Sequence, residues 1–303
     1  MTEQEYKRLL NGKLIIYRKS LDLPKNITFG VEIEYENIVV STLSHLLLEE
    51  TKNDKWLKGW ESKREFDIGE YNHLGEEING EVSSKILMDD EKNWGSLKNV
   101  LNIIRENDGI ITEKCGGHVN IGTHILERKK EYFRNFLLLW ILYEQEIYKF
   151  SSGDYVLVRY DYDRLLEKIS EDIDIKDIIN IRKFNYFSKL PKCLFDKRHD
   201  VFIDGTIKKE KALENRIEFR IPNGSLEEEI WQNYINFFAK FLIACTKELD
   251  VEKTLYKIEK KEHNAVELAD YVFNEEIDKE NFLIQTLKTN KIYKKELPKH
   301  IIY

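Results

Sequence analysis

The chain has 303 residues, with 48 Lys and Arg against 55 Asp and Glu, and its formal net charge is −7. This length suffices for a full hydrophobic core, and it is long for one domain but short for two well-separated ones. The acidic balance supplies no broad cationic field, so nucleic acid is not an expected partner. The most apolar run, residues 136–143, is too short to cross a bilayer, so no membrane contact is expected either.

Cysteine usage indicates the compartment. Cys115, Cys193 and Cys245 are widely spaced, odd in number and free of any C-x-x-C pair. This pattern is typical of a reduced, cytosolic protein. Residues 1–8 alternate acidic and basic side chains and lack the apolar centre of a signal peptide. A cytoplasmic protein is therefore expected.

The first part of the chain alternates predicted helices with predicted strands. In order these are a weak helix within 1–20, a strand at 29–40, a helix at about 41–55, a mixed segment with hairpin character at 56–74, a strand at 77–87 and a helix that stops before the turn at 107–109. Ser41 is the expected cap of the second helix. The third helix is predicted from the helical spacing of Leu97, Val100 and Ile104.

The remaining elements are a strand around His118, a helix at 126–150, two short helices and a loop within 154–200, a strand through Glu218, a helix opened by a capping box at 225–228, and a charged helical segment from 250 onward. Strands interleaved with helices predict an α+β fold in which helices cover one face of a curved, largely antiparallel sheet. We expect one catalytic domain over residues 1–249 and a peripheral, charged helical C-terminal extension over 250–303.

Four segments, residues 30–36, 77–83, 115–122 and 215–221, place acidic, imidazole or guanidinium side chains on alternate residues. Successive side chains of a strand point to opposite faces, so these groups are expected to share one face of a sheet. The polar set is Glu32, Glu34, Glu36, Glu81, His118, Asn120, Arg216, Glu218 and Arg220. Apolar residues between them, such as Val31, Val119 and Phe219, are expected to pack beneath.

Carboxylates with one imidazole suit Mg²⁺ or Mn²⁺, because hard cations prefer oxygen ligands and Mn²⁺ accepts a histidine nitrogen. The usual zinc signatures do not occur. The glutamates of 32–36 are also compatible with a solvated strand edge, and a lone histidine such as His118 is more often structural. Gly116 and Gly117, directly before His118, favour close approach of a phosphate or sugar to the backbone.

Arg216, Glu218 and Arg220 have two interpretations. They fit a salt-bridge ladder, which contributes little at a surface. They also fit a metal-ligating carboxylate flanked by two guanidinium groups, whose planar fork matches phosphate geometry. No G-x-x-x-x-G-K-[ST] loop and no G-x-G-x-x-G fingerprint is present, so a bound nucleotide would be held through its metals.

Taken in order, the segments 30–34, 80–83, 115–120 and 216–220 resemble the motif set of the amidoligase family, relatives of glutamine synthetase and γ-glutamylcysteine ligase. The resemblance spans roughly residues 28–245. It implies a glutamine-synthetase-like sheet that uses ATP and Mg²⁺ or Mn²⁺ ions. It also implies an ATP-dependent ligase that joins a carboxylate substrate to an amine substrate, an amino acid, peptide or protein, through an acyl-phosphate.

The resemblance further implies roles for the site residues. Glu32, His118 and Glu218 would hold the metal that bridges the transferring phosphate, and Glu34 and Glu81, with Glu77, the metal near the acyl and amine substrates. Arg220 and Arg216 would bind the phosphoryl group, and Glu81 would help to remove the proton of the amine. Asn120 would contact the nucleotide, at a position where the family commonly has a second histidine. Arg182, Asn185 and Arg198 are candidates for facing the substrate.

Two alternatives stay open from the sequence. Guanidino kinases share the general sheet architecture, so the site could phosphorylate a nitrogen without ligating anything. A degenerate module that binds a nucleotide or metal without turnover is the other, and Asn120 is the residue that favours it.

Overall fold

The computed structural model describes residues 1–64, 71–112, 114–127, 129–152 and 216–296. Its centre is a sheet of five strands in the spatial order β2-β3-β1-β4-β5. The strands are β1 (Phe29–Glu36), β2 (Glu61–Lys63), β3 (Asn79–Ser83), β4 (Gly117–Gly122) and β5 (Arg216–Phe219). Every neighbouring pair is antiparallel, so the expectation of a largely antiparallel sheet is confirmed.

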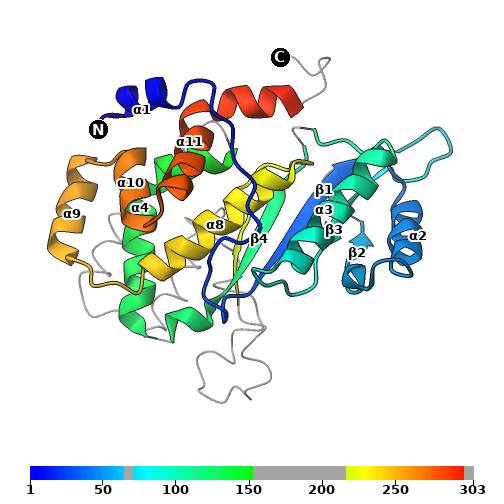
Figure 1. The fold of residues 1–303 in the computed structure, drawn as a ribbon, viewed down its shortest axis with the longest axis horizontal. Coiled ribbons are helices and arrows are strands. Elements are labelled where there is room, and N and C mark those ends of the chain that lie inside the picture. Colours follow the sequence, from blue (N-terminus) through cyan, green and yellow to red (C-terminus); the bar gives the residue numbers. More distant parts are fainter. Residues whose placement is uncertain (65–70, 113, 128, 153–215, 297–303) are drawn as a thin grey trace.

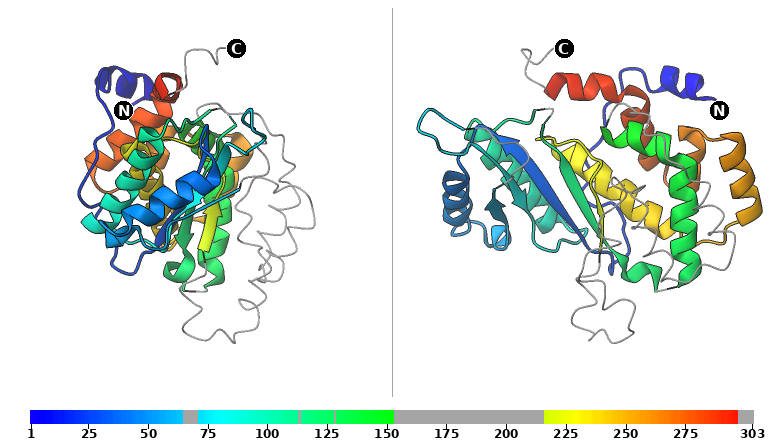
Figure 2. Two further views of the ribbon diagram at one scale, coloured as in Figure 1. Left: turned by 90° about the vertical axis from the view of Figure 1, so that its right-hand side faces the viewer. Right: turned by 180° about the vertical axis from the view of Figure 1, so that it is seen from behind.

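The described residues also form eight helices. They are α1 (Glu3–Leu9), α2 (Val40–Glu50), α3 (Glu91–Glu106), α4 (Lys130–Ser152), α8 (Glu228–Ala244), α9 (Val251–Lys260), α10 (Ala265–Val272) and α11 (Glu276–Glu296), with short 3₁₀ turns η1 (Lys55–Leu57) and η2 (Thr123–Leu126). Helices α3 and α8 lie over the same face of the sheet (Figures 1 and 2). Within the described ranges, none of the helices combines the length and apolar character needed to span a membrane.

The covered face of the sheet is apolar because the strands alternate. Val31, Ile217 and Phe219 have 1% or less of their surface exposed. The ring of Phe219 stacks on Phe238 of α8 at 4.1 Å, and Phe29 stacks on Trp94 of α3 at 5.0 Å. Such aromatic contacts add to the burial of a large apolar area. The polar residues of the same strands therefore face the other side.

Several helix starts differ from the sequence prediction. Helix α2 begins at Val40 with Val39 as its N-cap, so Ser41 lies in the first turn. Helix α8 begins at Glu228 after Glu227, without the expected capping box. Ser225 instead accepts a hydrogen bond from the Glu227 backbone N–H, which forms a turn before the helix. Helix α4 starts only at Lys130, because η2 ends at Glu127 in the left-handed conformation (φ 48°).

The described residues of the mixed segment 56–74 contain one short strand. This strand, β2, pairs with β3 in a register that sets Lys63 opposite Glu81. The hairpin was expected within residues 56–74, whereas the partner of β2 lies beyond this segment. As an edge strand of three residues, β2 carries a charged side chain, which is a common feature of sheet edges.

The C-terminal helices are less peripheral than expected. Leu268 of α10 and Phe282 of α11 have no exposed surface. Phe282 stacks on Phe237 of α8 at 5.0 Å and lies 4.9 Å from Phe150 of α4. The charged residues dominate the composition of this segment, but its apolar residues recur at helical spacing and face the core. The domain division at residue 249 stays a prediction.

Residues 13–28 form an extended segment that runs from α1 past α8 into β1, and we call it the N-terminal strap (Figure 1). Side-chain amides pair with its backbone as a neighbouring strand would. Asn281 accepts from Ile16 N–H and donates to Ile16 C=O, both at 3.0 Å, and Gln232 does the same with Arg18 at 2.7 Å. These pairs satisfy backbone groups that no sheet satisfies.

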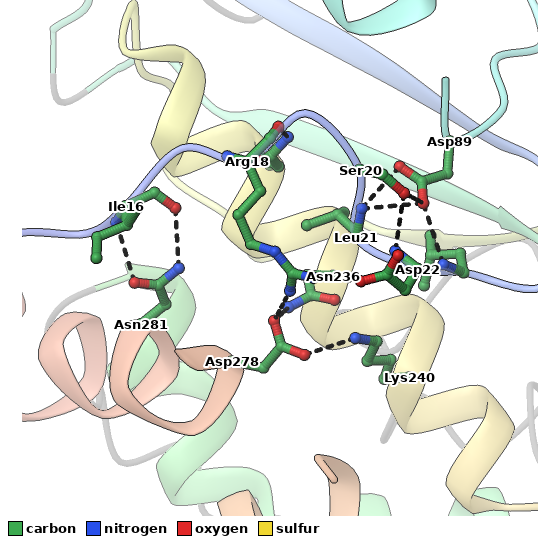
Figure 3. A network of polar contacts seen from close by, with 12 residues as sticks. Ile16, Arg18, Ser20, Leu21, Asp22, Asp89, Asn236, Lys240, Asp278 and Asn281 are labelled. Carbon is green, nitrogen blue, oxygen red and sulfur yellow. Dashed lines mark hydrogen bonds and ion pairs between the residues drawn. The ribbon is translucent and has the colours of Figure 1, made fainter. Parts of the chain in front are cut away.

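A buried carboxylate fixes the middle of the strap. Asp278 of α11 has no exposed surface, and it accepts hydrogen bonds from Arg18 of the strap and from Asn236 and Lys240 of α8 (Figure 3). One carboxylate therefore joins the strap to two helices. Since the strap continues directly into β1, this network also anchors the strand that carries Glu32.

Candidate functional site

The sheet register brings polar residues from distant segments side by side. Glu32 of β1 lies opposite His118 of β4, and Glu34 lies opposite Glu81 of β3. On the other side of β4, Asn120 lies opposite Glu218 of β5. The polar residues Glu32, Glu34, Glu81, His118, Asn120 and Glu218 thus meet on one face, as the alternation predicts.

His118 lies at the centre of this group. Its Nδ1 is 2.9 Å from Oε2 of Glu32, 3.7 Å from Oε1 of Glu218 and 4.0 Å from Oε2 of Glu81. Its Nε2 is 3.4 Å from Oε1 of Glu34. The imidazole is almost fully buried, and the four carboxylates are mostly buried around it. We call these five residues the acidic cluster.

Glu32 has a strongly perturbed acidity. Burial alone would raise the pKa of Glu32, but the hydrogen bond and charge of His118, the charge of Lys63 and the amide of Asn120 lower it from 4.5 to about 2. Asn120 donates to Oε1 of Glu32 at 3.2 Å and accepts from Nε of Arg216 at 2.7 Å. Asn120 therefore links a guanidinium to a carboxylate, and Glu32 stays ionised at any physiological pH.

Arg220 approaches the cluster from the end of β5. Its Nη1 donates a hydrogen bond to Oε1 of Glu218. Burial disfavours the charged guanidinium, yet the hydrogen bond and charge of Glu218, together with Glu32 and Glu34, raise the pKa of Arg220. The expected salt-bridge contact between Glu218 and an arginine is present, and it lies beside the acidic cluster instead of on a separate surface.

Lys63 is a site residue that the sequence prediction missed. Its Nζ is 2.9 Å from Oε1 of Glu81, which also accepts from Ser83 Oγ at 2.8 Å. Once β2 is recognised as a strand that pairs with β3, the same alternation places Lys63 on the polar face. The strand is only three residues long, so its own sequence gives no clear signal.

The two glycines before His118 lie close to side chains of other elements. A Cβ on Gly117 would lie 2.6 Å from the Trp231 ring, so Gly117 makes room for α8 on the apolar face. A Cβ on Gly116 would lie 3.2 Å from Glu34, and the Gly116 N–H donates to that carboxylate. Both glycines therefore accommodate neighbouring side chains, and the approach of a phosphate or sugar to their backbone stays a prediction. Two other glycines, Gly30 and Gly122, line a cavity.

These contacts predict losses of stability of different size for two alanine variants. Gly117→Ala is expected to lower the free energy of unfolding by about 2–3 kcal/mol, because the new methyl overlaps a buried ring. Gly30→Ala, whose Cβ would be 3.2 Å from Ser84 Oγ, is expected to cost less than about 1 kcal/mol. Urea unfolding of both proteins measures this. A Gly117→Ala protein as stable as Gly30→Ala would contradict the packing argument.

Two further predicted residues lie near the cluster without contacting His118. Glu36 is buried, and its Oε1 has no hydrogen-bond partner. Glu77 pairs with Arg64, whose Nε is 3.3 Å from Oε2 of Glu77.

The candidates Arg182, Asn185 and Arg198, and also Cys193, lie outside the described residues. Cys115 and Cys245 are free and buried, and burial raises the pKa of Cys115 to about 12.

A cavity of about 360 Å³ adjoins the cluster on the polar face. Its wall includes Gly30, Glu32, Lys63, Lys85, Asn120 and Arg216. Three of these side chains are cationic, although the protein as a whole is acidic. Lys85, also missed by the sequence prediction, donates from its ammonium to the Trp56 carbonyl at 2.7 Å, which holds the ammonium in place. The cavity suits an anionic ligand that reaches toward the carboxylates.

The donor set fits a hard divalent cation. Glu32, Glu81 and His118 each offer one ligand atom, and these atoms lie within 4.8 Å of one another. Several carboxylates around one imidazole repel each other unless cations compensate. Oxygen-rich sites with a single imidazole suit Mg²⁺ or Mn²⁺ better than Zn²⁺. The orphaned oxygen of Glu36 adds a further buried acceptor to the same strand.

Comparison with known proteins agrees with this geometry. Residues 25–242 match the model of a family described as "putative amidoligase enzyme". The matched segment contains all five strands and therefore every described residue of the acidic cluster. No curated protein matches the sequence. Since the family model covers well over half of its length, the chain belongs to the putative amidoligase family.

Proposed function

We propose that the protein is an ATP-dependent carboxylate-amine ligase that forms an amide bond through an acyl-phosphate. The observation that supports this most strongly is the acidic cluster beside a cationic cavity, in a chain of the amidoligase family. Acyl-phosphate chemistry brings together a triphosphate, a carboxylate and an amine. A site for it needs hard-cation ligands and guanidinium or ammonium groups within reach of one another.

In this proposal the acidic cluster holds Mg²⁺ or Mn²⁺. Glu32, His118 and Glu218 are assigned to the ion on the nucleotide side, and Glu34 and Glu81 to the ion on the substrate side. When bound, such ions polarise phosphoryl oxygens and neutralise the charge that develops during transfer. Asn120 orients Glu32 by its hydrogen bond and keeps Arg216 at the wall of the cavity.

The cationic side chains of the cavity are assigned to the anionic reactants. Lys85 and Arg216 bind non-transferring phosphate oxygens, and Arg220 binds the oxygens of the transferring phosphoryl group. The substrate carboxylate attacks the γ-phosphorus, and ADP leaves. The amine then attacks the acyl carbon, inorganic phosphate leaves, and a carboxylate such as Glu81 accepts the proton released by the amine.

Hydroxylamine can stand in for the natural amine in a test of this reaction. The protein, MgATP and hydroxylamine are incubated with a panel of carboxylic acids, amino acids and acidic peptides, and ADP, phosphate and hydroxamate are measured. Hydroxylamine is a small, strong nucleophile, so it intercepts an acyl-phosphate. The expected result is ADP release and equal hydroxamate formation with one class of acid, both dependent on Mg²⁺ or Mn²⁺.

Other outcomes would contradict the proposal in distinguishable ways. ATP turnover that is the same with and without an acid would exclude acyl-phosphate formation. A stable phosphorylated nitrogen compound without phosphate release would indicate a guanidino-kinase-like phosphotransferase. Binding of MgATP without turnover across the panel would indicate a degenerate nucleotide-binding module.

The metal assignment predicts a characteristic change of stability. Glu34→Gln removes one negative charge from the cluster while its amide oxygen still accepts from Gly116 N–H. The metal-free variant is expected to be more stable than the wild type by about 1 kcal/mol, because repulsion among the carboxylates falls. Wild-type protein at about 100 times the metal Kd is expected to gain about 2.7 kcal/mol.

In Glu34→Gln this gain is expected to shrink to less than half. Thermal unfolding with and without Mn²⁺ measures both effects. Glu106→Gln, on the exposed end of α3, is the matched control and should behave as the wild type. Metal-free destabilisation of Glu34→Gln combined with an unchanged response to Mn²⁺ would show that Glu34 is a structural residue and no ligand.

A further inference from the structure

The side chain of Lys63 occupies an unusual position between the acidic cluster and the cavity. Its Nζ is 2.9 Å from Glu81 Oε1, and the same residue lines the cavity. Its backbone is held by the pairing of β2 with β3, in which Lys63 lies opposite Glu81. Its side chain, in contrast, is 57% exposed, whereas that of Glu81 is 6% exposed. The backbone is fixed, while the exposed stem allows the ammonium to turn.

The ammonium acts on two carboxylates of the cluster. It pairs with Glu81, and its charge contributes to the low pKa of Glu32. Glu32 and Glu81 are two of the three residues whose ligand atoms converge, with His118 as the third. Lys63 therefore supplies positive charge to the same oxygen atoms that a divalent cation would use.

We propose that Lys63 is the counter-cation of the metal-free site, and that divalent cations binding to the acidic cluster, with Glu81 among their ligands, displace its ammonium into the cavity, where it binds oxygens of the phosphoryl-bearing reactant. This inference rests on the metal assignment of the proposed function. It adds a positioning residue and an order of binding. Metal binds first, and the anionic reactant then gains a cation that was previously paired with Glu81.

Electrostatics favours this exchange. A divalent cation on Glu81 would lie within a few ångströms of the ammonium, and the two would repel each other strongly in a partly buried site. The ion pair that is lost is weak in comparison, because more than half of the Lys63 side chain is in contact with solvent. The flexible four-carbon stem of lysine lets the charge move while the strand stays in place.

The exchange makes the two binding events cooperative. If metal binding releases Lys63 to the anion, the bound anion must strengthen metal binding by the same factor. Lys85 lines the same cavity but is held by the Trp56 carbonyl, and no carboxylate contacts it in the described part of the chain. It should contribute to anion affinity without contributing to the coupling.

The first experiment follows the ammonium directly. The full-length protein is treated with an amine-acetylating reagent, and the modification rate of Lys63 is measured by mass spectrometry relative to Lys58, an exposed lysine of the preceding turn. Addition of Mn²⁺ alone is expected to raise the rate at Lys63 about fivefold, the lower end of typical coupling between sites. Further addition of a nonhydrolysable ATP analogue is expected to lower it again.

The second experiment compares metal affinity among variants by electron paramagnetic resonance of free Mn²⁺. Lys63→Met is expected to bind Mn²⁺ about fivefold more tightly than the wild type, because no ammonium competes. Lys63→Arg should retain the competition, and Lys58→Met should match the wild type. Lys85→Met should leave Mn²⁺ affinity unchanged and should lower the affinity for the nonhydrolysable ATP analogue.

The outcomes separate this inference from the proposed function. If Mn²⁺ fails to bind, or binds equally to the wild type and to a His118→Ala variant, the metal assignment itself is wrong. If Mn²⁺ binds at the cluster but the acetylation rate of Lys63 stays constant or falls, and Lys63→Met binds the metal no more tightly, only the exchange is wrong. In that case Lys63 is a fixed partner of Glu81.

Discussion

Glu32→Gln is expected to lower kcat/KM for the proposed ligation by about 10³-fold, which corresponds to about 4 kcal/mol of transition-state stabilisation. The change keeps the size of the side chain and removes its charge. Glu32 contacts both His118 and Asn120, and its low pKa shows how strongly its surroundings favour the ionised form. A neutral amide at this position would remove the anion that the charges of His118 and Lys63 stabilise.

The loss should appear mainly in kcat. An uncharged side chain holds a divalent cation poorly, and the transferring phosphoryl group then meets less positive charge in the transition state. Metal affinity, measured independently of activity, is expected to fall in parallel. Glu106→Gln is again the control. If Glu32→Gln retains more than about a tenth of the wild-type activity, Glu32 is not a metal ligand of the reaction.

The alternation of polar and apolar residues explains why the centre of the site follows from sequence. In β1 the residues 31, 33 and 35 are buried against helices and the residues 32 and 34 face the cluster. A shift of one residue would reverse both faces, so the pattern fixes which side chains share a surface. The partners Glu81, His118 and Glu218 follow by the same rule. Which strands are neighbours is a long-range property, and the alternation alone does not give it.

The parts that the sequence did not predict depend on contacts between distant segments. Gly117 is next to His118 in the chain, yet its lack of a side chain is explained by Trp231 of α8, more than a hundred residues away. Lys63 joins the site because β2 pairs with β3. The charged composition after residue 250 suggested a peripheral segment, although Phe282 packs against Phe237 in the core. Composition averages over both faces of a helix and so hides an apolar stripe.

The hydrogen bonds of Asn120 bear on whether the site is degenerate. The resemblance implies a histidine at this position, and the replacement by Asn120 was the reason to keep a degenerate module as an alternative. In the structure its amide connects Glu32 to Arg216. An amide has both a donor and an acceptor group, so it joins a carboxylate and a guanidinium whatever the pH. This arrangement supports a retained role in orienting the site.

Asp278→Ala is expected to lower the free energy of unfolding by about 3–5 kcal/mol, the range seen when one partner of a buried ion network is removed. The variant would leave the mostly buried ammonium of Lys240 without its carboxylate, and the guanidinium of Arg18 would keep only its pair with the exposed Asp22 (Figure 3). Urea unfolding measures the change. The control is Glu280→Ala, because Glu280 lies on the same helix as Asp278 and forms a more exposed ion pair with Lys13 of the strap. This variant should lower the free energy of unfolding by less than about 1 kcal/mol.

A compensating variant tests the cause of this loss. The triple change Arg18→Met, Lys240→Met and Asp278→Leu removes all three charges together, and it is expected to recover part of the stability, because replacing a buried ion network by apolar groups is often neutral. Asn236 would still lose one hydrogen bond, so recovery should be incomplete. If the single and triple variants are equally unstable, the network acts through its shape and not its charge. Since the strap continues into β1, any loss of this anchor also loosens the strand on which Glu32 and Glu34 are held.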